Sequence, residues 1–213
     1  MPSFKVLIPS LLALTLAACG GKGEFDETGG VKIVRSSCPA VAIPAFTGDV
    51  TLFNPESSRD ANAIDVVATL TDVRTTCNDT GAQIAATATF DVLARRSSAA
   101  GPRDVVLPYF ATVTRAGTQI ISKQVGRVAL HFEDGQLRAQ TRGSASASIA
   151  RAEATLPPNI EERLNRKRKA GDADAAIDPM TEPAIRSAVS KASFELLVGF
   201  QLTNDQLAYN ATR

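Results

Sequence analysis

The sequence predicts an all-β fold: an immunoglobulin-like antiparallel β-sandwich with a short two-helix insertion near the C-terminus. Three observations predict it. Apolar and polar residues alternate with period two through the middle of the chain, which is typical of half-buried antiparallel strands. Turn sequences rich in Gly, Asn and Asp separate these stretches. Two stretches of helical periodicity interrupt the pattern after residue 157.

The alternation defines the expected strands. In the clearest stretch, Ile84, Phe90 and Val92 share a face with two alanines, while Thr87 and Asp91 lie opposite. Further stretches lie at 64–70, 107–113, 128–132, 137–141, 145–149 and 194–202. A possible first strand is expected at 31–34 and a last one at 207–209, after a turn at 203–206. Short strands at such spacing are typical of a β-sandwich.

A helical excursion is expected at about 157–192. Asn159 with Glu162 resembles a capping box, and Gly171 suits the position after the helix end. A second helix is expected from Thr181, with Pro183 in its first turn. About 35 residues are too few for an independent core. The segment is therefore interpreted as an insertion within one domain over 31–213.

The N-terminus has the parts of a bacterial lipoprotein signal peptide over residues 1–18. Lys5 gives a short basic region, Val6–Leu16 is apolar, and Leu16–Cys19 resembles a lipobox. The resemblance implies cleavage before Cys19 and acylation of that residue; an ordinary signal peptide is the alternative. Gly20 in place of Asp implies sorting to the outer membrane, facing the periplasm. Residues 19–30 are interpreted as a flexible tether.

Lipidation of Cys19 leaves two of the three cysteines, Cys38 and Cys77. In an oxidising compartment an even pair predicts a disulfide. It closes a loop of about 40 residues and is expected to stabilise the fold by about 4 kcal/mol in the chain-entropy model. Two free thiols or a metal-binding pair are the alternatives.

Little in the sequence indicates catalysis. The net charge of +1 argues against nucleic acid as the main partner. The single histidine, His131, lies on the polar face of a strand, and no nucleophile motif accompanies it. Asp172, Asp174 and Asp178 do not have calcium-loop spacing and are interpreted as a solvated turn and helix cap. We therefore expect no catalytic residues, no metal and no cofactor.

A basic stretch is the sharpest functional hint. It consists of Arg163, Arg166, Lys167, Arg168 and Lys169. These side chains could bind anionic lipid head groups or lipopolysaccharide phosphates, at about 1 kcal/mol for each basic residue. The other interpretation is structural: acidic residues begin the expected helix and basic residues end it, so both ends complement the helix dipole.

Three functions are weighed. The favoured one is a lipid-anchored, non-enzymatic envelope protein with a surface that binds an envelope protein or anionic glycolipid. The second is a hydrolase acting on an envelope polymer, for which Glu133, Asp134 and Glu195 are available. The third is a purely structural envelope lipoprotein.

Several stretches together resemble a family of uncharacterised alphaproteobacterial envelope lipoproteins. They are Cys38-Pro39 with Cys77, Leu107-Pro108-Tyr109-Phe110, Ser122-Lys123-Gln124, Gly199-Phe200-Gln201-Leu202 and Leu207-Ala208-Tyr209-Asn210. The resemblance covers most of the mature chain. It implies a β-sandwich and an envelope location, and it carries no activity.

Overall fold

The computed structural model describes residues 36–166, 171–173 and 177–212. The signal peptide, Cys19, the tether and the strand expected at 31–34 lie outside the described residues. Residues 36–166 and 177–212 belong to one unit. The description below concerns that unit.

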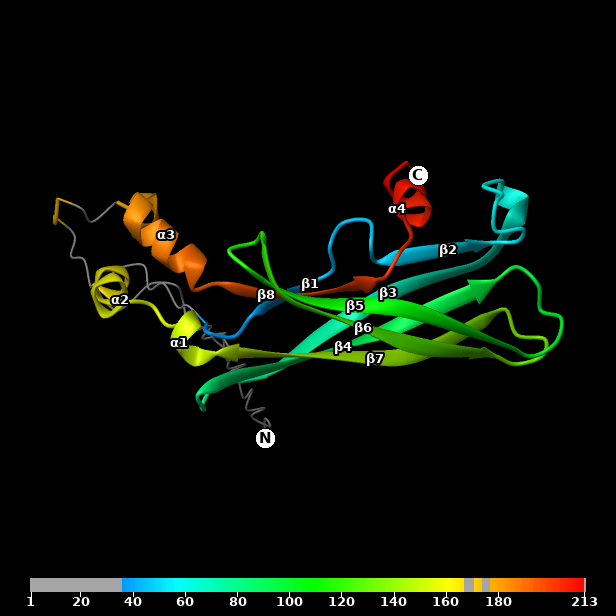
Figure 1. Ribbon diagram of the computed structural model, residues 1–213, viewed down its shortest axis with the longest axis horizontal. Coiled ribbons are helices and arrows are strands. Elements are labelled where there is room, and N and C mark those ends of the chain that lie inside the picture. The colour runs from blue at the N-terminus through cyan, green and yellow to red at the C-terminus, as the bar shows by residue number, and fades with distance from the viewer. Residues whose placement is uncertain (1–35, 167–170, 174–176, 213) are drawn as a thin grey trace, which may run out of the picture. The chain divides into compact units, whose positions relative to one another are not determined.

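Two four-stranded sheets form the unit (Figure 1). The first has the order β1-β8-β5-β6, with β1 at Ala40–Ala42, β8 at Phe194–Phe200, β5 at Arg103–Arg115 and β6 at Gln119–Phe132. The second has the order β2-β3-β4-β7, with β2 at Asp49–Phe53, β3 at Ile64–Asn78, β4 at Gln83–Arg96 and β7 at Arg138–Ala150. Neighbouring strands are antiparallel, except that β1 and β8 are parallel.

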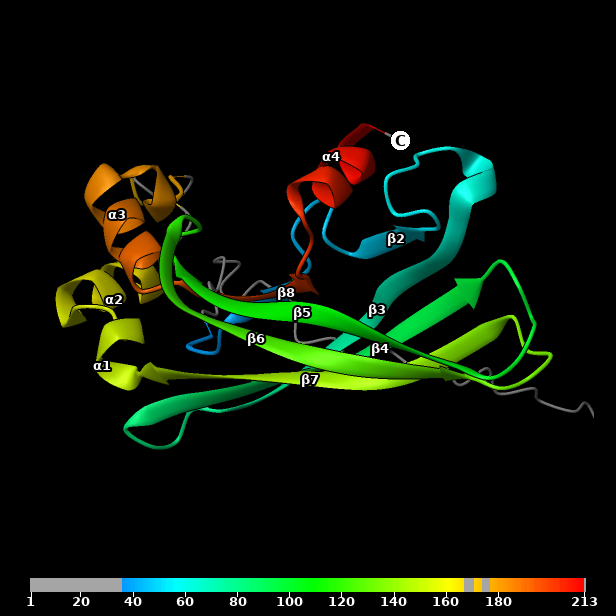
Figure 2. The same cartoon turned by 45° about the vertical axis from the view of Figure 1, so that its right-hand side comes forward.

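The helices are short, and most follow β7 in the chain. They are the 3-10 helices η1 (Ala61–Ala63) and η2 (Pro179–Thr181) and the α-helices α1 (Arg151–Ala154), α2 (Pro158–Asn165), α3 (Pro183–Lys191) and α4 (Asn204–Thr212). Both views place α1, α2 and α3 together at the end of the sheets where β7 ends (Figure 2). Helix α4 lies near β2.

The predicted mostly-β fold with a few helices near the C-terminus is confirmed. In β4, the alternating residues Ile84, Phe90 and Val92 are at most 1 % exposed and lie in one core with residues from both sheets. In β8, the alternating residues Phe194, Leu196, Val198 and Phe200 are buried as expected. The five central strands β3 to β7 are longer than the short strands expected, at 13 to 15 residues each.

Two aromatic residues meet between the sheets, each facing a glycine on a neighbouring strand. Phe90 of β4 is opposite Gly143 of β7, and Tyr109 of β5 is opposite Gly126 of β6. The two rings pack edge to face with centroids 5.1 Å apart. The Tyr109 hydroxyl donates a hydrogen bond of 2.6 Å to the backbone oxygen of Ser144 in β7. Tyr109 therefore connects the first sheet to the edge of the second.

The predicted disulfide is confirmed. Cys38 and Cys77 are bonded, with their Cα atoms 6.1 Å apart. Cys38 precedes β1 of the first sheet, and Cys77 lies in β3 of the second. The bond therefore links the two sheets covalently near the start of the described chain.

The strand expected at 207–209 is wrong, because residues 204–212 form helix α4. Thr203 and Gln206 make a reciprocal capping box. The Gln206 amide N–H donates to Thr203 Oγ1 (3.2 Å), and the Thr203 amide N–H donates to Gln206 Oε1 (2.9 Å). This pair satisfies amide groups at the helix start. The segment expected to be a turn before a strand is instead a helix start.

The helix boundaries expected in the excursion also need correction. Helix α2 begins at Pro158 after Pro157, and the expected cap Asn159 lies inside it. The helix ends at Asn165, so Gly171 is not its terminating residue; Gly171 has a φ of +104°. The second helix, α3, begins at Pro183 rather than at Thr181, which ends η2. Proline fits the first turn because that turn has no intrahelical partner for its N–H.

Candidate binding surface on the hairpin of β5 and β6

Of the predicted basic stretch, the structure describes Arg163 and Arg166. Arg163 is in α2 and forms a two-pronged ion pair with Glu182, the residue before α3, with Nη1 to Oε1 at 2.9 Å. Arg166 follows the helix end. Residues 167–169 lie outside the described residues. Arg163 thus connects α2 to the residue that precedes α3.

His131 lies on the outward face of β6 and is 51 % exposed at its side chain. Its Nδ1 is 2.6 Å from Asp104 on β5, directly across the strand pair, and its Nε2 is 3.6 Å from Glu133. The hydrogen bond to Asp104 is the main cause that raises the pKa of His131 above 6.5, and the charges of Asp104 and Glu133 add to it. The arrangement stabilises an imidazolium on the surface.

The carboxylates available for hydrolysis do not form a pair across the first sheet. Glu195 lies opposite Thr114, whose partner in β6 is Ile120, whereas Glu133 follows the other end of β6. At roughly 3.3 Å per strand residue, the two acids are on the order of 40 Å apart. A glycosidase pair needs about 5 to 10 Å. The hydroxyl of Thr114 donates to Glu195 (3.0 Å).

Two of the remaining acidic candidates, Asp134 and Asp178, have structural partners. Asp134 accepts a hydrogen bond from the amide of Gly101 (2.9 Å), and Asp178 accepts one from the amide of Met180 (2.8 Å) at the start of η2. Asp174 lies outside the described residues. Across the described ranges, no three His, Cys, Asp or Glu side chains gather in a way that would hold a metal ion.

A shallow open hollow of about 600 Å³ lies where β7 leads into α1 and α2. It is lined by Ala82, Arg151, Ala152, Thr155, Leu156 and Pro157. The one charged side chain there, Arg151, donates through Nε to the backbone oxygen of Gly81 (2.6 Å). Its walls are otherwise mainly apolar, so the hollow offers little to orient a ligand.

The hairpin of β5 and β6 presents the most distinctive surface. The turn at 116–118 holds Ala116 and Gly117 at φ values of +56° and +75°, and the amide of Thr118 donates to the oxygen of Arg115 (3.3 Å). Two successive positive φ values are the signature of the type I′ turn that suits the twist of paired strands. The turn therefore sets the register of the hairpin.

Strand β6 consists of two different halves. From Val128 to Phe132 every second residue is buried, whereas all seven residues of Gln119–Val125 are exposed. We call Gln119–Val125 the tip half of β6. Gly126, which faces the Tyr109 ring, lies between the halves. Both views show the hairpin rising away from β7 toward its tip (Figures 1 and 2).

The outer face of this hairpin includes three large, exposed apolar residues. Val106, Ile120 and Val125 are 55 %, 66 % and 60 % exposed. On the outer face of β4 and β7 the cross-strand pairs are mainly polar, such as Thr87 with Ser146 and Asp91 with Arg142. Exposed apolar groups gathered on one element are typical of an interaction site.

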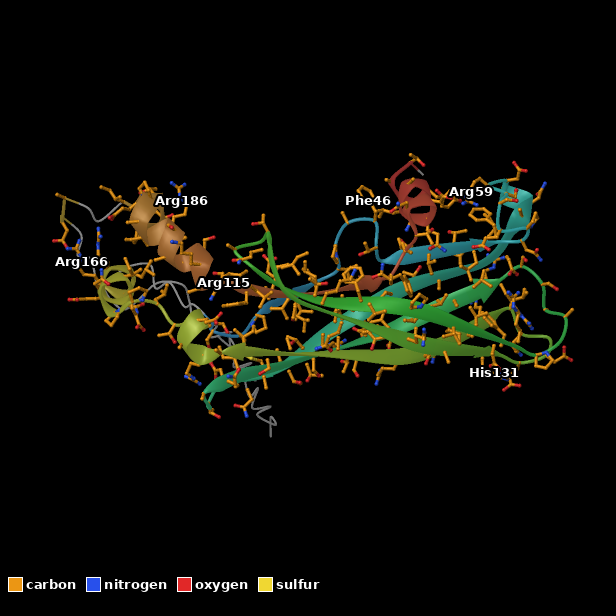
Figure 3. All side chains as sticks on the ribbon, in the orientation of Figure 1. Phe46, Arg59, Arg115, His131, Arg166 and Arg186 are labelled. Atoms are coloured by element: carbon orange, nitrogen blue, oxygen red, sulfur yellow. A yellow bond between two sulfur atoms is a disulfide. The ribbon has the colours of Figure 1, made fainter. Side chains whose placement is uncertain are left out.

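The charge of β6 has one sign. Its titratable side chains are Lys123, Arg127 and His131, and the strand contains no carboxylate. In the part of the chain that the structure describes, neither Lys123 nor Arg127 has an ion-pair partner. The Lys123 ammonium lies 5.4 Å from the centre of the Phe110 ring. Figure 3 shows the side chains along these strands.

The alternation of apolar and polar residues did not predict a strand over the tip half of β6. Such alternation is absent there because both faces of the strand are exposed. The turn at 116–118 carried the missing signal. The turn ends at Thr118, so a partner strand as long as β5 begins at Gln119, and the β-branched Ile120, Ile121 and Val125 favour a strand there.

Comparisons of the chain with protein-family models, with curated proteins and with solved structures gave no match. Within the described ranges, no helix combines the length and the apolar character that crossing a membrane requires.

Proposed function

We propose that this chain is a lipid-anchored envelope protein that presents a non-enzymatic binding surface in the periplasm, and that the surface is the outer face and free edge of the hairpin of β5 and β6. The observation that carries the proposal is the set of large apolar residues exposed on this hairpin, Val106, Ile120 and Val125. Exposed apolar residues on a long edge strand are a hazard unless a partner covers them.

The envelope location is supported by two independent features. The lipobox at Leu16–Cys19 provides the anchor. The bond between Cys38 and Cys77 is of a kind that persists in oxidising compartments and is rare in the cytosol. Two or more acyl chains on Cys19 would hold the domain on the membrane stably.

The finer description as an immunoglobulin-like sandwich is part of the same proposal. It is supported by two antiparallel sheets that share one core. The connectivity differs from that of an immunoglobulin domain. Strands β7 and β8 lie in different sheets, whereas the last two strands of an immunoglobulin domain share a sheet.

The test combines acylation with crosslinking in cells. Cys19→Ser should move the full chain from the membrane fraction to the soluble fraction and abolish incorporation of labelled palmitate. A photo-crosslinking residue at Val125 should give a discrete adduct in cells. The matched control is Leu93 on β4, an exposed apolar residue of the other sheet at 46 % exposure. Equal labelling from both positions, or none from Val125, would contradict the proposed surface.

A further inference from the structure

We propose that the tip half of β6 binds an extended, carboxylate-bearing segment of a partner protein as an added β-strand. The inference deepens the proposed function and rests on it. Three observations carry it. The tip half has a free backbone edge, both of its faces are exposed, and β6 carries positive charge without an ion-pair partner at Lys123 and Arg127.

The edge is free because β6 is the last strand of its sheet. Its strand neighbour among the described residues is β5, on one side. In an antiparallel strand, alternate N–H and C=O groups point away from that neighbour. An unpaired row of such groups is a template for another chain, and peptide recognition by strand addition uses it.

The tip half is open on both faces as well as at its edge. Ser122 and Gln124 continue the inward-facing row of Val128, but they are polar and exposed rather than buried. Ile120 and Val125 belong to the outer face and are exposed. An added strand can therefore place side chains beside both rows, with small polar ones beside the inner row, as cross-strand pairing favours.

The positive charge of β6 favours an acidic segment as the added strand. Lys123 and Arg127 stand on the same face of β6, and the nearest carboxylate across the strand pair, Asp104, is engaged by His131. Carboxylates on the added strand would lie beside Lys123 and Arg127, and opposite charges across strands stabilise pairing. Extended segments that carry acidic residues on one face and small polar residues on the other fit this edge.

A second copy of the chain fits less well. Antiparallel pairing of two β6 strands about residue 123 places Lys123 opposite itself, and pairing about residue 125 places Lys123 opposite Arg127. Like charges directly opposite destabilise a strand pair. The same positive charges that attract an acidic segment therefore oppose self-pairing in these registers.

The test uses the acylated full chain in detergent and a defined probe, a blocked eight-residue peptide that alternates Glu with Thr or Val. The peptide should slow amide hydrogen exchange in Gln119–Val125, and the same peptide with Lys in place of Glu should not. Lys123→Glu should weaken binding about tenfold or more, because it replaces attraction by repulsion. Lys123→Gln should weaken it less. Arg138→Glu, the same charge reversal on exposed β7, should bind like the parent.

Two outcomes would overturn strand addition. One is peptide binding whose protection falls outside β6, or no binding at all. The other is concentration-dependent protection of Gln119–Val125 without peptide, which would make a second copy the occupant. If Val125 still forms a specific adduct in cells, either result removes the strand-addition mechanism and leaves the proposed binding surface standing. Loss of that adduct removes the proposed function itself.

Discussion

The side-chain amide of Asn210, in helix α4, donates hydrogen bonds to the backbone oxygens of Phe46 (2.8 Å) and Asp49 (2.7 Å). Asn210 is 7 % exposed, and Phe46 has a φ of +65°, a conformation that bulky residues rarely adopt. The amide of Phe200 donates to the oxygen of Thr47 in the same loop (2.8 Å). The C-terminal helix and the end of β8 thus fix the loop between β1 and β2.

Asn210→Ala should lower the free energy of unfolding by about 2 kcal/mol, because it leaves two backbone oxygens without their donor. Urea denaturation followed by circular dichroism measures the change. Asn204→Ala, at the exposed start of the same helix, is the matched control and should change stability by less than about 0.5 kcal/mol. A similar loss in both variants would contradict the role of the contact between Asn210 and the loop.

Arg96 holds the loops that follow β4 and β6. It is 2 % exposed, and its guanidinium donates to the backbone oxygens of Ala99, Gly101, Glu133 and Gln136 at 2.7 to 3.0 Å. Arg96→Lys should cost about 3 kcal/mol, since an ammonium cannot reproduce the planar fork and leaves buried acceptors unpaired. Arg95→Lys, the exposed neighbour in β4, should be nearly neutral. Equal stability of the two variants would contradict this role of the Arg96 guanidinium.

Breaking the bond between Cys38 and Cys77 should destabilise the fold by about 4 kcal/mol, because it frees a loop spanning 39 positions in the unfolded chain. The measurement is the urea midpoint of the full chain with and without reductant. A double variant, Cys38→Ser with Cys77→Ser, should unfold at the reduced midpoint and ignore the reductant. Insensitivity of the parent chain to reductant would show that the bond adds no stability.

The core strands were predictable because one face of each is buried. Burial forces alternation, and Ile84, Phe90 and Val92 show it directly in the sequence. The disulfide was predictable by elimination once Cys19 was assigned to lipid. In contrast, the tip half of β6 has no buried face, so no hydrophobic period marks it.

The C-terminal helix was missed for a different reason. Leu207 and Tyr209 alternate as a strand would, yet the capping pair of Thr203 and Gln206 starts a helix, and the buried Asn210 holds that helix on the loop at Phe46. A short helix depends on such tertiary contacts more than on propensity. The role of Arg163 was also missed, because its partner Glu182 lies across the helical excursion.

The single His131 should titrate with a pKa above 6.5, chiefly because of its hydrogen bond to Asp104. Because the pKa is higher in the folded chain than in the unfolded chain, the contact contributes its full stabilisation at a pH below the unfolded pKa of about 6.5. This contribution is lost as the pH rises through the folded pKa. Asp104→Asn should lower the pKa, and Glu133→Gln should lower it less. Titration of the one imidazole by NMR measures both, and an unchanged pKa in Asp104→Asn would refute the assignment.

Gly126 should tolerate no side chain while Tyr109 stands opposite. A Cβ at this position would lie 2.4 Å from Cζ of the Tyr109 ring, so the ring would have to leave its contact with Phe90 and its bond to Ser144. Gly126→Ala should therefore cost about 1 to 3 kcal/mol.

The control for this prediction is the same substitution without the ring. In a Tyr109→Ala background, Gly126→Ala should be neutral or stabilising by up to about 1 kcal/mol, because alanine restricts the unfolded chain more than glycine does. Unfolding free energies of the parent, the two single variants and the double variant give the coupling between the two sites. An equal cost of Gly126→Ala in both backgrounds would mean that the backbone conformation at residue 126, and not the Tyr109 ring, requires glycine. A strong coupling would establish that this contact sets the point at which β6 leaves the core and its tip half becomes exposed.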